Sequence, residues 1–274
     1  MPELPEVETV RRDLASLAVG RVIEQVEATA PRCIRRHPSA EDFCGRLAGG
    51  RIGEVDRRGK YLLVRLDGGV VLVVHLGMSG QLLWVPAEAV ADEPRRKHTH
   101  VVLTLDAGEV RYVDPRTFGE LFVTTDDVPE LAHLGPDAIA VGPADLKTVL
   151  RARRTQLKPL LMDQRFLAGI GNLYADEILW LAKLRYDRPA DSLTAAEVRR
   201  LHAAMVETLN AAIERRGSSL ADEQYRDLFG AVGDYQADHN AYDREGKPCP
   251  RCGRPIVRLK WSGRSTFLCP RCQR

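Results

Sequence analysis

The sequence predicts an α+β fold in three parts, because its pattern changes twice along the 274 residues. A helical run over the first 20 residues leads into short strands that continue to about residue 125. Helical periodicity replaces them from residue 144, and four of the six cysteines fall in the last 26 residues. We therefore predict an N-terminal helix and β-sandwich domain over 1–130, a helical domain over 131–243 and a zinc-binding hairpin over 244–274.

The composition is typical of a globular protein, with 44% hydrophobic and 28% charged residues. No apolar run approaches the ~20 residues that cross a membrane, and the acidic N-terminus is unlike a signal peptide. We therefore expect a cytoplasmic protein. The net charge is only +2, but residues 244–274 carry nine Lys or Arg against one acid, a local charge of +8. Such a surface favours a polyanionic partner, although solvated surface charge alone would also explain it.

The first residues combine a helix start with two reactive groups. Pro5 suits a first helical turn, an apolar stripe follows at helical spacing, and Gly20 ends the run. Removal of Met1 would leave a secondary amine on Pro2 beside the acid of Glu3, at the positive end of the helix. A neutral amine can attack a carbonyl-like carbon to give an iminium, and the acid can deliver a proton. The alternative is a capped surface helix whose terminus has no chemical role.

Strand pairs follow the first helix. Apolar segments at 61–66 and 70–76 are separated by Asp-Gly-Gly, and those at 101–105 and 110–113 by Asp-Ala-Gly. These are hairpin signals, and short strands at this spacing indicate a sandwich or barrel.

The helical region contains four periodic segments, at 144–153, 157–166, 173–183 and 195–215. A short link with weak helical character precedes them at 131–140, and Thr194 with Glu197 forms a capping-box pattern. The polar stretch 220–242 is expected to be a flexible loop with partial helix.

The cysteines carry the most specific spacing in the chain. Cys249-Pro-Arg-Cys252 and Cys269-Pro-Arg-Cys272 are sixteen residues apart, which fits a tetrahedral four-thiolate zinc site. A module of ~25 residues cannot bury a core of its own, so the metal supplies folding energy. Four thiolates leave no open position, and the single zinc is therefore structural. Two disulfides are the alternative, and they conflict with the expected compartment. The remaining cysteines, Cys33 and Cys44, are expected to be free thiols.

Three stretches are suited to holding a charged ligand, which for Arg264 would be a phosphate. Lys60 follows Gly59 at a strand start, Asn172 opens a helix after a Gly-Ile-Gly turn, and Arg264 follows Gly263 at the hairpin tip. A solvated strand end, a plain helix corner and an exposed fingertip are the alternatives.

Met78, Arg116 and Phe118 lie on expected loops, where they could fill the space left by an extruded base. The alternative is that Met78 and Phe118 belong to the core.

Together these motifs resemble those of bacterial formamidopyrimidine-DNA glycosylase, also called 8-oxoguanine DNA glycosylase. The resemblance runs in order along the whole chain, through Met1-Pro-Glu-Leu-Pro-Glu-Val-Glu-Thr9, Gly59-Lys60, Asp114-Pro-Arg-x-Phe-Gly119, Gly169-Ile-Gly-Asn172 and the cysteine finger. It implies an N-terminal helix with a β-sandwich, a helix–two-turns–helix domain with a lesion-recognition loop, and a β-hairpin zinc finger.

The resemblance also implies roles for individual residues. The catalytic set is Pro2, Glu3, Lys60 and Arg264. The DNA-binding set is His75, Met78, His98, Arg116, Phe118, Arg154 and Asn172. Thr117 stands where the family commonly has a second arginine, so the resemblance does not extend to the phosphate contact of that arginine. The match over 220–242 is too loose to say which residue recognises the damaged base.

The implied function is a bifunctional DNA glycosylase and AP lyase, acting as a monomer in base excision repair. It would excise 8-oxoguanine and formamidopyrimidines from double-stranded DNA through a Schiff base on Pro2, followed by β,δ-elimination. No membrane and no cofactor beyond zinc are expected. One alternative is the sister enzyme endonuclease VIII, which prefers oxidised pyrimidines; Leu4 argues against it, because that branch usually has glycine there. The other alternative is a non-catalytic DNA-binding zinc protein.

Overall fold

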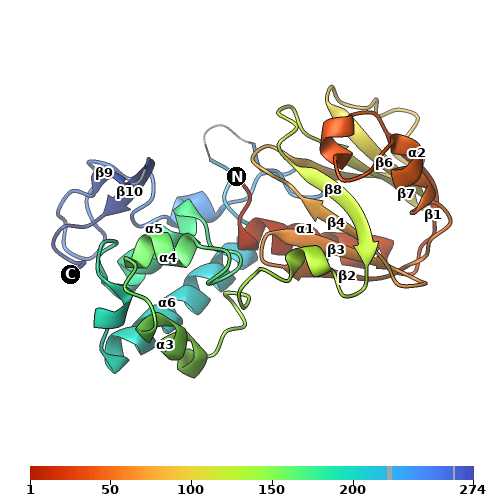
Figure 1. The fold of residues 1–274 in the computed structure, drawn as a ribbon. Coiled ribbons are helices and arrows are strands. Elements are labelled where there is room, and N and C mark those ends of the chain that lie inside the picture. Colours follow the sequence, from red (N-terminus) through yellow and green to blue (C-terminus); the bar gives the residue numbers. More distant parts are fainter. Residues whose placement is uncertain (221–223, 262) are drawn as a thin grey trace. The chain divides into compact units, whose positions relative to one another are not determined.

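The chain folds into two compact units in this computed structural model, which describes residues 1–220, 224–261 and 263–274 (Figure 1). The first unit comprises Met1–Ala132 with Arg215–Asp234, and the second comprises His133–Glu214 with Tyr235–Arg274. This grouping differs from the division expected from the sequence in two places. The segment Arg215–Asp234 joins the strands and not the helices, and the cysteine finger shares a unit with the helices.

The first unit begins with helix α1 (Leu4–Ala18), as the apolar spacing predicts. Glu3 is its N-cap, and a capping box closes the start of the helix: the Glu3 N–H donates to Glu6 Oε2 at 2.8 Å, and the Glu6 N–H donates to the Glu3 side chain. Val7, Val10 and Leu14 are buried on one face of the helix. The same apolar stripe that predicts α1 therefore anchors its terminus to the core.

The described strands of the first unit form two antiparallel four-stranded sheets, which confirms the predicted sandwich. Both predicted hairpins are present, joining β3 to β4 and β6 to β7. One sheet has the order β2 (Ile52–Arg58), β3 (Tyr61–Leu66), β4 (Val70–His75), β8 (Glu120–Thr125). The other has the order β1 (Ile23–Ala28), β6 (Thr99–Leu105), β7 (Gly108–Val113), β5 (Gln81–Pro86).

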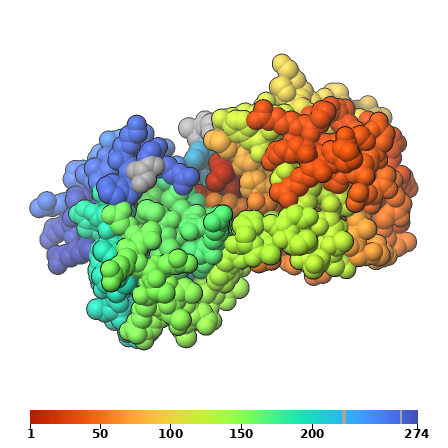
Figure 2. All heavy atoms as spheres, in the orientation of Figure 1, coloured from red at the N-terminus to blue at the C-terminus, as the bar shows by residue number. Residues whose placement is uncertain are grey.

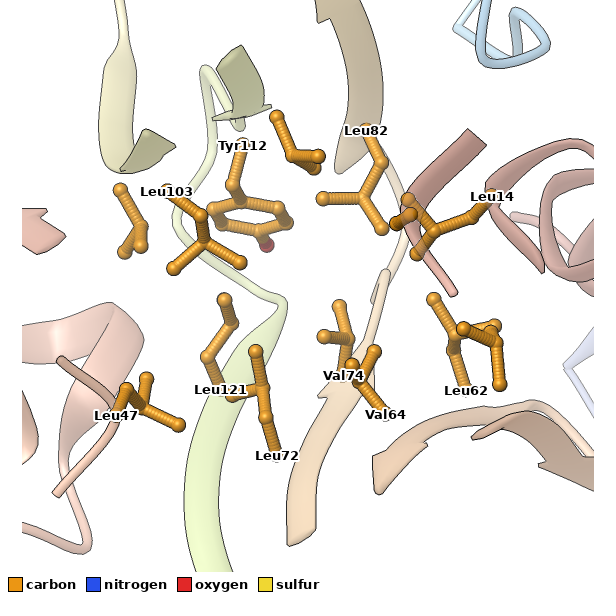
Figure 3. Packing of buried hydrophobic residues seen from close by; sticks show 14 of the residues in the cluster. Leu14, Leu47, Leu62, Val64, Leu72, Val74, Leu82, Leu103, Tyr112 and Leu121 are labelled. Atoms are coloured by element: carbon orange, nitrogen blue, oxygen red, sulfur yellow. The ribbon is translucent and has the colours of Figure 1, made fainter. Parts of the chain in front are cut away.

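The core of this unit lies between the two sheets. In Figure 3, Leu82, Leu103 and Tyr112 from one sheet face side chains of β3, β4 and β8 from the other. Leu14 of α1 lies at one side of this layer. Short helices complete the unit: η1 (Pro31–Ile34), α2 (Ala40–Gly45), η2 (Ala87–Ala89) and η3 (Pro129–Leu131). Residues near η1 and α2 cover part of its surface in Figure 2.

The segment Arg215–Asp234 joins this unit through specific polar contacts. The Ser218 N–H donates to Glu6 Oε1 at 2.9 Å, and the Trp84 N–H donates to the Leu228 carbonyl at 2.8 Å. The Arg216 guanidinium also pairs with Asp13 of α1. The stretch 220–242 was expected to be a flexible loop with partial helix, and its described part contains hydrogen-bonded turns and the short helix η5 (Tyr235–Asp238). Residues 221–223 lie outside the described residues.

The second unit contains the predicted helices, although one is shorter than expected. Its elements are α3 (Pro143–Arg151), α4 (Leu157–Met162), α5 (Asn172–Ala182), η4 (Ala190–Ser192), α6 (Ala195–Glu214), η5 (Tyr235–Asp238), β9 (Val257–Trp261) and β10 (Arg264–Leu268). The Thr194–Glu197 capping box is confirmed, with the Thr194 N–H donating to Glu197 Oε2 at 2.9 Å. The weakly helical link expected at 131–140 lies outside any helix after η3 ends at Leu131.

Helix α4 ends at Met162, four residues before the predicted end, because local side chains compete for the backbone. Asp163 Oδ1 accepts from the Arg165 N–H at 2.9 Å, and Gln164 Oε1 accepts from the Gly169 N–H at 2.9 Å. No helix in the described segments combines the length and apolar character needed to cross a membrane.

Candidate functional site

The N-terminal pair Pro2 and Glu3 is buried at the start of α1. Glu3 is 4% exposed, and its carboxylate is fixed by the capping box with Glu6. Glu6 is itself buried and accepts hydrogen bonds from the Glu3 and Ser218 backbone N–H groups. Met1 is present, so the Pro2 nitrogen is part of a peptide bond here. Both residues therefore lie at the start of α1, where the sequence places them, and loss of Met1 would free the Pro2 amine.

Lys60 lies in the two-residue turn of the β2–β3 hairpin, after Gly59. Gly59 has a φ of 59°, a conformation that favours glycine in such a turn. The Arg57 guanidinium donates to the Gly59 carbonyl at 2.9 Å and pairs with Glu8 of α1 at 3.1 Å. Lys60 is only 7% exposed, so the alternative of a freely solvated strand-end lysine is wrong. Sequence patterns did not single out Arg57 or Glu8, because their contact joins distant segments.

His75 is half-buried near Lys60, at the end of β4. It pairs across the sheet with Tyr61, the residue after Lys60, and the two rings are 4.6 Å apart. Burial, followed by the charge of the Lys60 ammonium, lowers the pKa of His75 to about 4. The imidazole is therefore neutral at physiological pH, and it does not add a second positive charge beside Lys60.

Met78, Arg116 and Phe118 lie on two loops of the first unit, outside its core. Met78 is 38% exposed and Phe118 is 41% exposed, which excludes the alternative that both are core residues. The Arg116 guanidinium stacks over the Phe118 ring, with its carbon 4.6 Å from the ring centre. Thr117, between them, has a φ of 50°. Half-buried His98, a predicted DNA contact of the same unit, has a φ of 69°.

Asn172 is the first residue of α5, as predicted, and Gly171 is the N-cap. The Gln164 side chain holds the preceding turn, because its amide donates to the Ile170 carbonyl at 2.7 Å and its oxygen accepts from Gly169. Within the described part of the chain, the buried Asn172 Oδ1 has no hydrogen-bond partner. Arg154, by contrast, is a surface residue whose side chain is 96% exposed. The helix start therefore presents a polar amide on a fixed turn.

Arg264 is the first residue of β10 and is exposed at the tip of the β9–β10 hairpin. The tip prediction included Ser262, which lies outside the described residues. Arg264 lines a cavity of about 250 Å³ together with Met162 of α4, and its Nη1 approaches the Met162 sulfur at 3.9 Å. This is the fingertip arginine expected from the sequence.

A buried ion pair, which the sequence did not predict, anchors β10 just beyond Arg264. Lys158 Nζ lies 2.7 Å from Asp176 Oδ1, and it also donates to the Ser265 carbonyl and to Thr266 Oγ1. Asp176 Oδ2 accepts from the Phe267 N–H at 3.0 Å. Burial raises the pKa of Asp176 to about 7, against the opposing effect of the Lys158 ammonium. Two helices thus fix the backbone that carries Arg264.

The four cysteines of the finger fit a single structural zinc. Their sulfurs all lie within 4.8 Å of one another, with Cys249 and Cys272 4.0 Å apart and Cys252 and Cys269 3.5 Å apart. Zn–S bonds of ~2.3 Å in a tetrahedron require sulfurs ~3.8 Å apart. None of the six cysteines forms a disulfide, so the disulfide alternative is not supported.

The first knuckle of the finger is joined to the helices by Arg251. Its guanidinium donates to the Trp180 and Leu181 carbonyls at the end of α5 and stacks on the Trp180 ring at 3.8 Å.

The predicted catalytic and DNA-binding residues divide between the two units. Pro2, Glu3, Lys60, His75, Met78, His98, Arg116 and Phe118 are in the first unit, and Arg154, Asn172, Arg264 and the zinc cysteines are in the second.

Family comparisons cover almost the whole chain. Residues 1–121 match the formamidopyrimidine-DNA glycosylase N-terminal domain, and residues 134–224 match the H2TH domain of the same enzyme. Residues 246–274 match a zinc finger found in FPG and IleRS.

Individual relatives have the same extent as this chain. A formamidopyrimidine-DNA glycosylase of Heliobacterium modesticaldum is 46% identical over 281 residues, covering 100% of both chains. One from Thermus thermophilus is 45% identical over 280 residues, covering 100% of this chain and 98% of that protein. The crystal structure of MutM (Fpg) from Thermus thermophilus is similar with a TM-score of 0.87 at 44% identity, covering 99% and 98% of the two chains. Lactococcus lactis Fpg in complex with DNA containing N7-benzyl-Fapy-dG has a TM-score of 0.89 at 35% identity, covering 99% of each.

Proposed function

Because the chain belongs to the formamidopyrimidine-DNA glycosylase family, we propose that it is a DNA glycosylase and AP lyase that excises oxidised purines from duplex DNA. The observation that carries this proposal is the buried Pro2–Glu3 pair at the start of α1. An amine and an acid in adjacent, fixed positions can perform both steps of an iminium mechanism. The complex of Lactococcus lactis Fpg with DNA containing N7-benzyl-Fapy-dG supports the substrate class.

The first chemical step forms a bond between the Pro2 nitrogen and C1′ of the damaged nucleotide. The glycosidic bond breaks and its electron pair leaves with the base, which takes up the proton that the Pro2 nitrogen loses. Glu3 donates a proton to the sugar ring oxygen, the ring opens, and the nitrogen lone pair forms the iminium. The capping box fixes the Glu3 carboxyl beside Pro2, so the acid is already oriented before DNA binds.

The iminium then makes the adjacent C2′ proton acidic, and loss of that proton expels the 3′ phosphate. A second elimination expels the 5′ phosphate, and water releases the sugar remnant from Pro2. Lys60 is suited to assist these steps, because it lies in the β2–β3 turn beside a neutral His75, where a lysine side chain can contact a phosphate. Arg264 would contact the flanking phosphates through its guanidinium.

The DNA must first extrude the damaged nucleotide, because C1′ cannot be attacked inside the base stack. Met78 and Phe118 are exposed apolar side chains that would occupy the vacated space, with Arg116 facing the unpaired base. Asn172, at the start of α5, would bind a backbone phosphate through its amide.

Borohydride trapping tests the proposal. Wild-type protein, with loss of Met1 verified by mass, should form a covalent adduct with duplex DNA containing 8-oxoguanine opposite cytosine. Pro2→Gly should abolish the adduct, whereas Pro5→Ala, which changes a proline of the same helix start, should retain it. A wild-type protein that binds this DNA without forming an adduct would show that the proposal is wrong. A panel that includes thymine glycol identifies the preferred base.

A further inference from the structure

One buried carboxylate connects the loops of the first unit that carry the exposed residues Met78, Arg116 and Phe118. Asp114 follows β7 and is 0% exposed. Its Oδ1 accepts from Ser79 Oγ at 2.6 Å and from the Arg116 N–H at 3.2 Å. Ser79 is next to Met78, so this carboxylate bonds to both loops at once.

The second carboxylate oxygen completes the connection. Asp114 Oδ2 accepts from the Gly119 N–H at 2.8 Å and from the Tyr112 hydroxyl at 2.9 Å. The Asp114 N–H donates to the carbonyl of His98, another predicted DNA contact, at 3.0 Å. Burial acts to raise the pKa of Asp114, but the hydrogen bonds from Ser79, Gly119 and Tyr112 outweigh it and hold the pKa below its ordinary value.

The two loops are also packed backbone against backbone. A Cβ on Gly77 would lie 2.5 Å from the Gly119 nitrogen, and a Cβ on Gly119 would lie 1.9 Å from the Tyr112 hydroxyl. Gly77 also has a φ of 62°, which favours glycine. The loops therefore have one close-packed arrangement, and Asp114 is at its centre.

We propose that Asp114 is a positioning residue that fixes Met78 and Phe118 in the geometry needed to occupy the space left by an extruded base. This inference rests on the proposed function. Side chains that occupy the space of an extruded base prevent the base from returning to the stack. If the loops that carry these side chains became ordered only during extrusion, the entropy cost of ordering them would reduce the binding free energy. The network removes that cost, since both loops are already joined in the free protein.

The test compares excision from a closed duplex with excision from a duplex opened in advance. Ser79→Ala removes only the hydroxyl that joins the Met78 loop to Asp114, and Asp114→Asn disrupts the whole network. Both variants should excise 8-oxoguanine from a fully paired duplex roughly ten-fold more slowly in single turnover. Both should approach the wild-type rate when mismatches flank the lesion, because less work is then needed to extrude it.

Ser39→Ala is the matched control, because it also removes one serine hydroxyl and one hydrogen bond, here the bond that Ser39 Oγ accepts from the Asp42 N–H at the start of α2. It should match wild type on both duplexes. If Ser79→Ala slows excision from both duplexes equally, or slows excision from neither, the inference is overturned. This result is decisive even if Asp114→Asn fails to fold.

A second measurement does not depend on catalysis. A 2-aminopurine beside a stable abasic analogue should fluoresce less with Ser79→Ala than with wild type, and equal fluorescence would also overturn the inference. Absence of any borohydride adduct with wild type would instead refute the proposed function.

Discussion

Replacing Lys158 with Met should destabilise the second unit more than any surface substitution in it. Lys158 Nζ is 2.7 Å from Asp176, and the two side chains are 3% and 1% exposed. The variant would leave a buried carboxylate without its counter-ion and two acceptors on β10 without their donor. Breaking a buried pair in this way costs about 3–5 kcal/mol.

The charge of Asp176 determines how the loss of stability in Lys158→Met depends on pH. Burial already raises the pKa of this carboxyl to about 7 with Lys158 present. Without the ammonium the carboxyl would bind a proton more readily, and protonation would relieve the unpaired charge. The destabilisation by Lys158→Met should therefore be larger at pH 8 than at pH 5. Asp176→Asn added to Lys158→Met should restore about 2 kcal/mol or more, since it removes the uncompensated charge.

Urea unfolding, followed by tryptophan fluorescence, measures the free energy of unfolding of the second unit. A Trp84→Phe background leaves Trp180 and Trp261 as reporters, and both lie in that unit. Zinc is kept saturating throughout. Lys147→Met on α3 is the control, and it should change the free energy of unfolding by less than about 0.5 kcal/mol. A loss below about 1 kcal/mol for Lys158→Met, or no recovery in the double variant, would refute the reasoning.

Three further predictions follow from the site. Removing zinc with a chelator should speed amide exchange at the end of α5, where Arg251 caps two carbonyls, and leave exchange in α1 unchanged. The pKa of His75 falls from 6.5 to about 4 on folding, so between pH 4 and pH 6.5 the unfolded chain binds more protons than the folded chain. The free energy of unfolding of the first unit should therefore rise with pH across this range. His75→Gln should make that rise smaller, as measured by unfolding at several pH values. Arg116→Ala should reduce the ratio of the excision rate opposite cytosine to the excision rate opposite the other bases ~10-fold, as measured in single turnover.

Local patterns in the sequence predicted the parts of the fold that depend on neighbouring residues. The stripe of Val7, Val10 and Leu14 predicted α1, and the Asp-Gly-Gly and Asp-Ala-Gly turns predicted two hairpins. Cysteine spacing predicted a zinc site, and the four sulfurs lie within 4.8 Å of one another. Each of these signals is contained in a short stretch, where periodicity or turn chemistry decides the structure.

Features that depend on distant contacts were not predictable. Arg215–Asp234 joins the strands because its backbone finds Glu6 and other groups of the first unit, and no local signal in a polar loop indicates that choice. The early end of α4 was missed for a local reason, because the Asp163 and Gln164 side chains bond to the backbone N–H groups of Arg165 and Gly169, and helical periodicity does not register this competition. The network around Asp114 depends on Ser79, 35 residues away along the chain.

The central claim is that the amine of Pro2 forms the bond to the sugar. Mass spectrometry of the proteolysed borohydride adduct tests it most directly. We predict that the reduced sugar remnant lies on the N-terminal peptide, on the Pro2 nitrogen, in protein that has lost Met1. A remnant on Lys60 or on any other lysine, with the Pro2 peptide unmodified, would contradict the account.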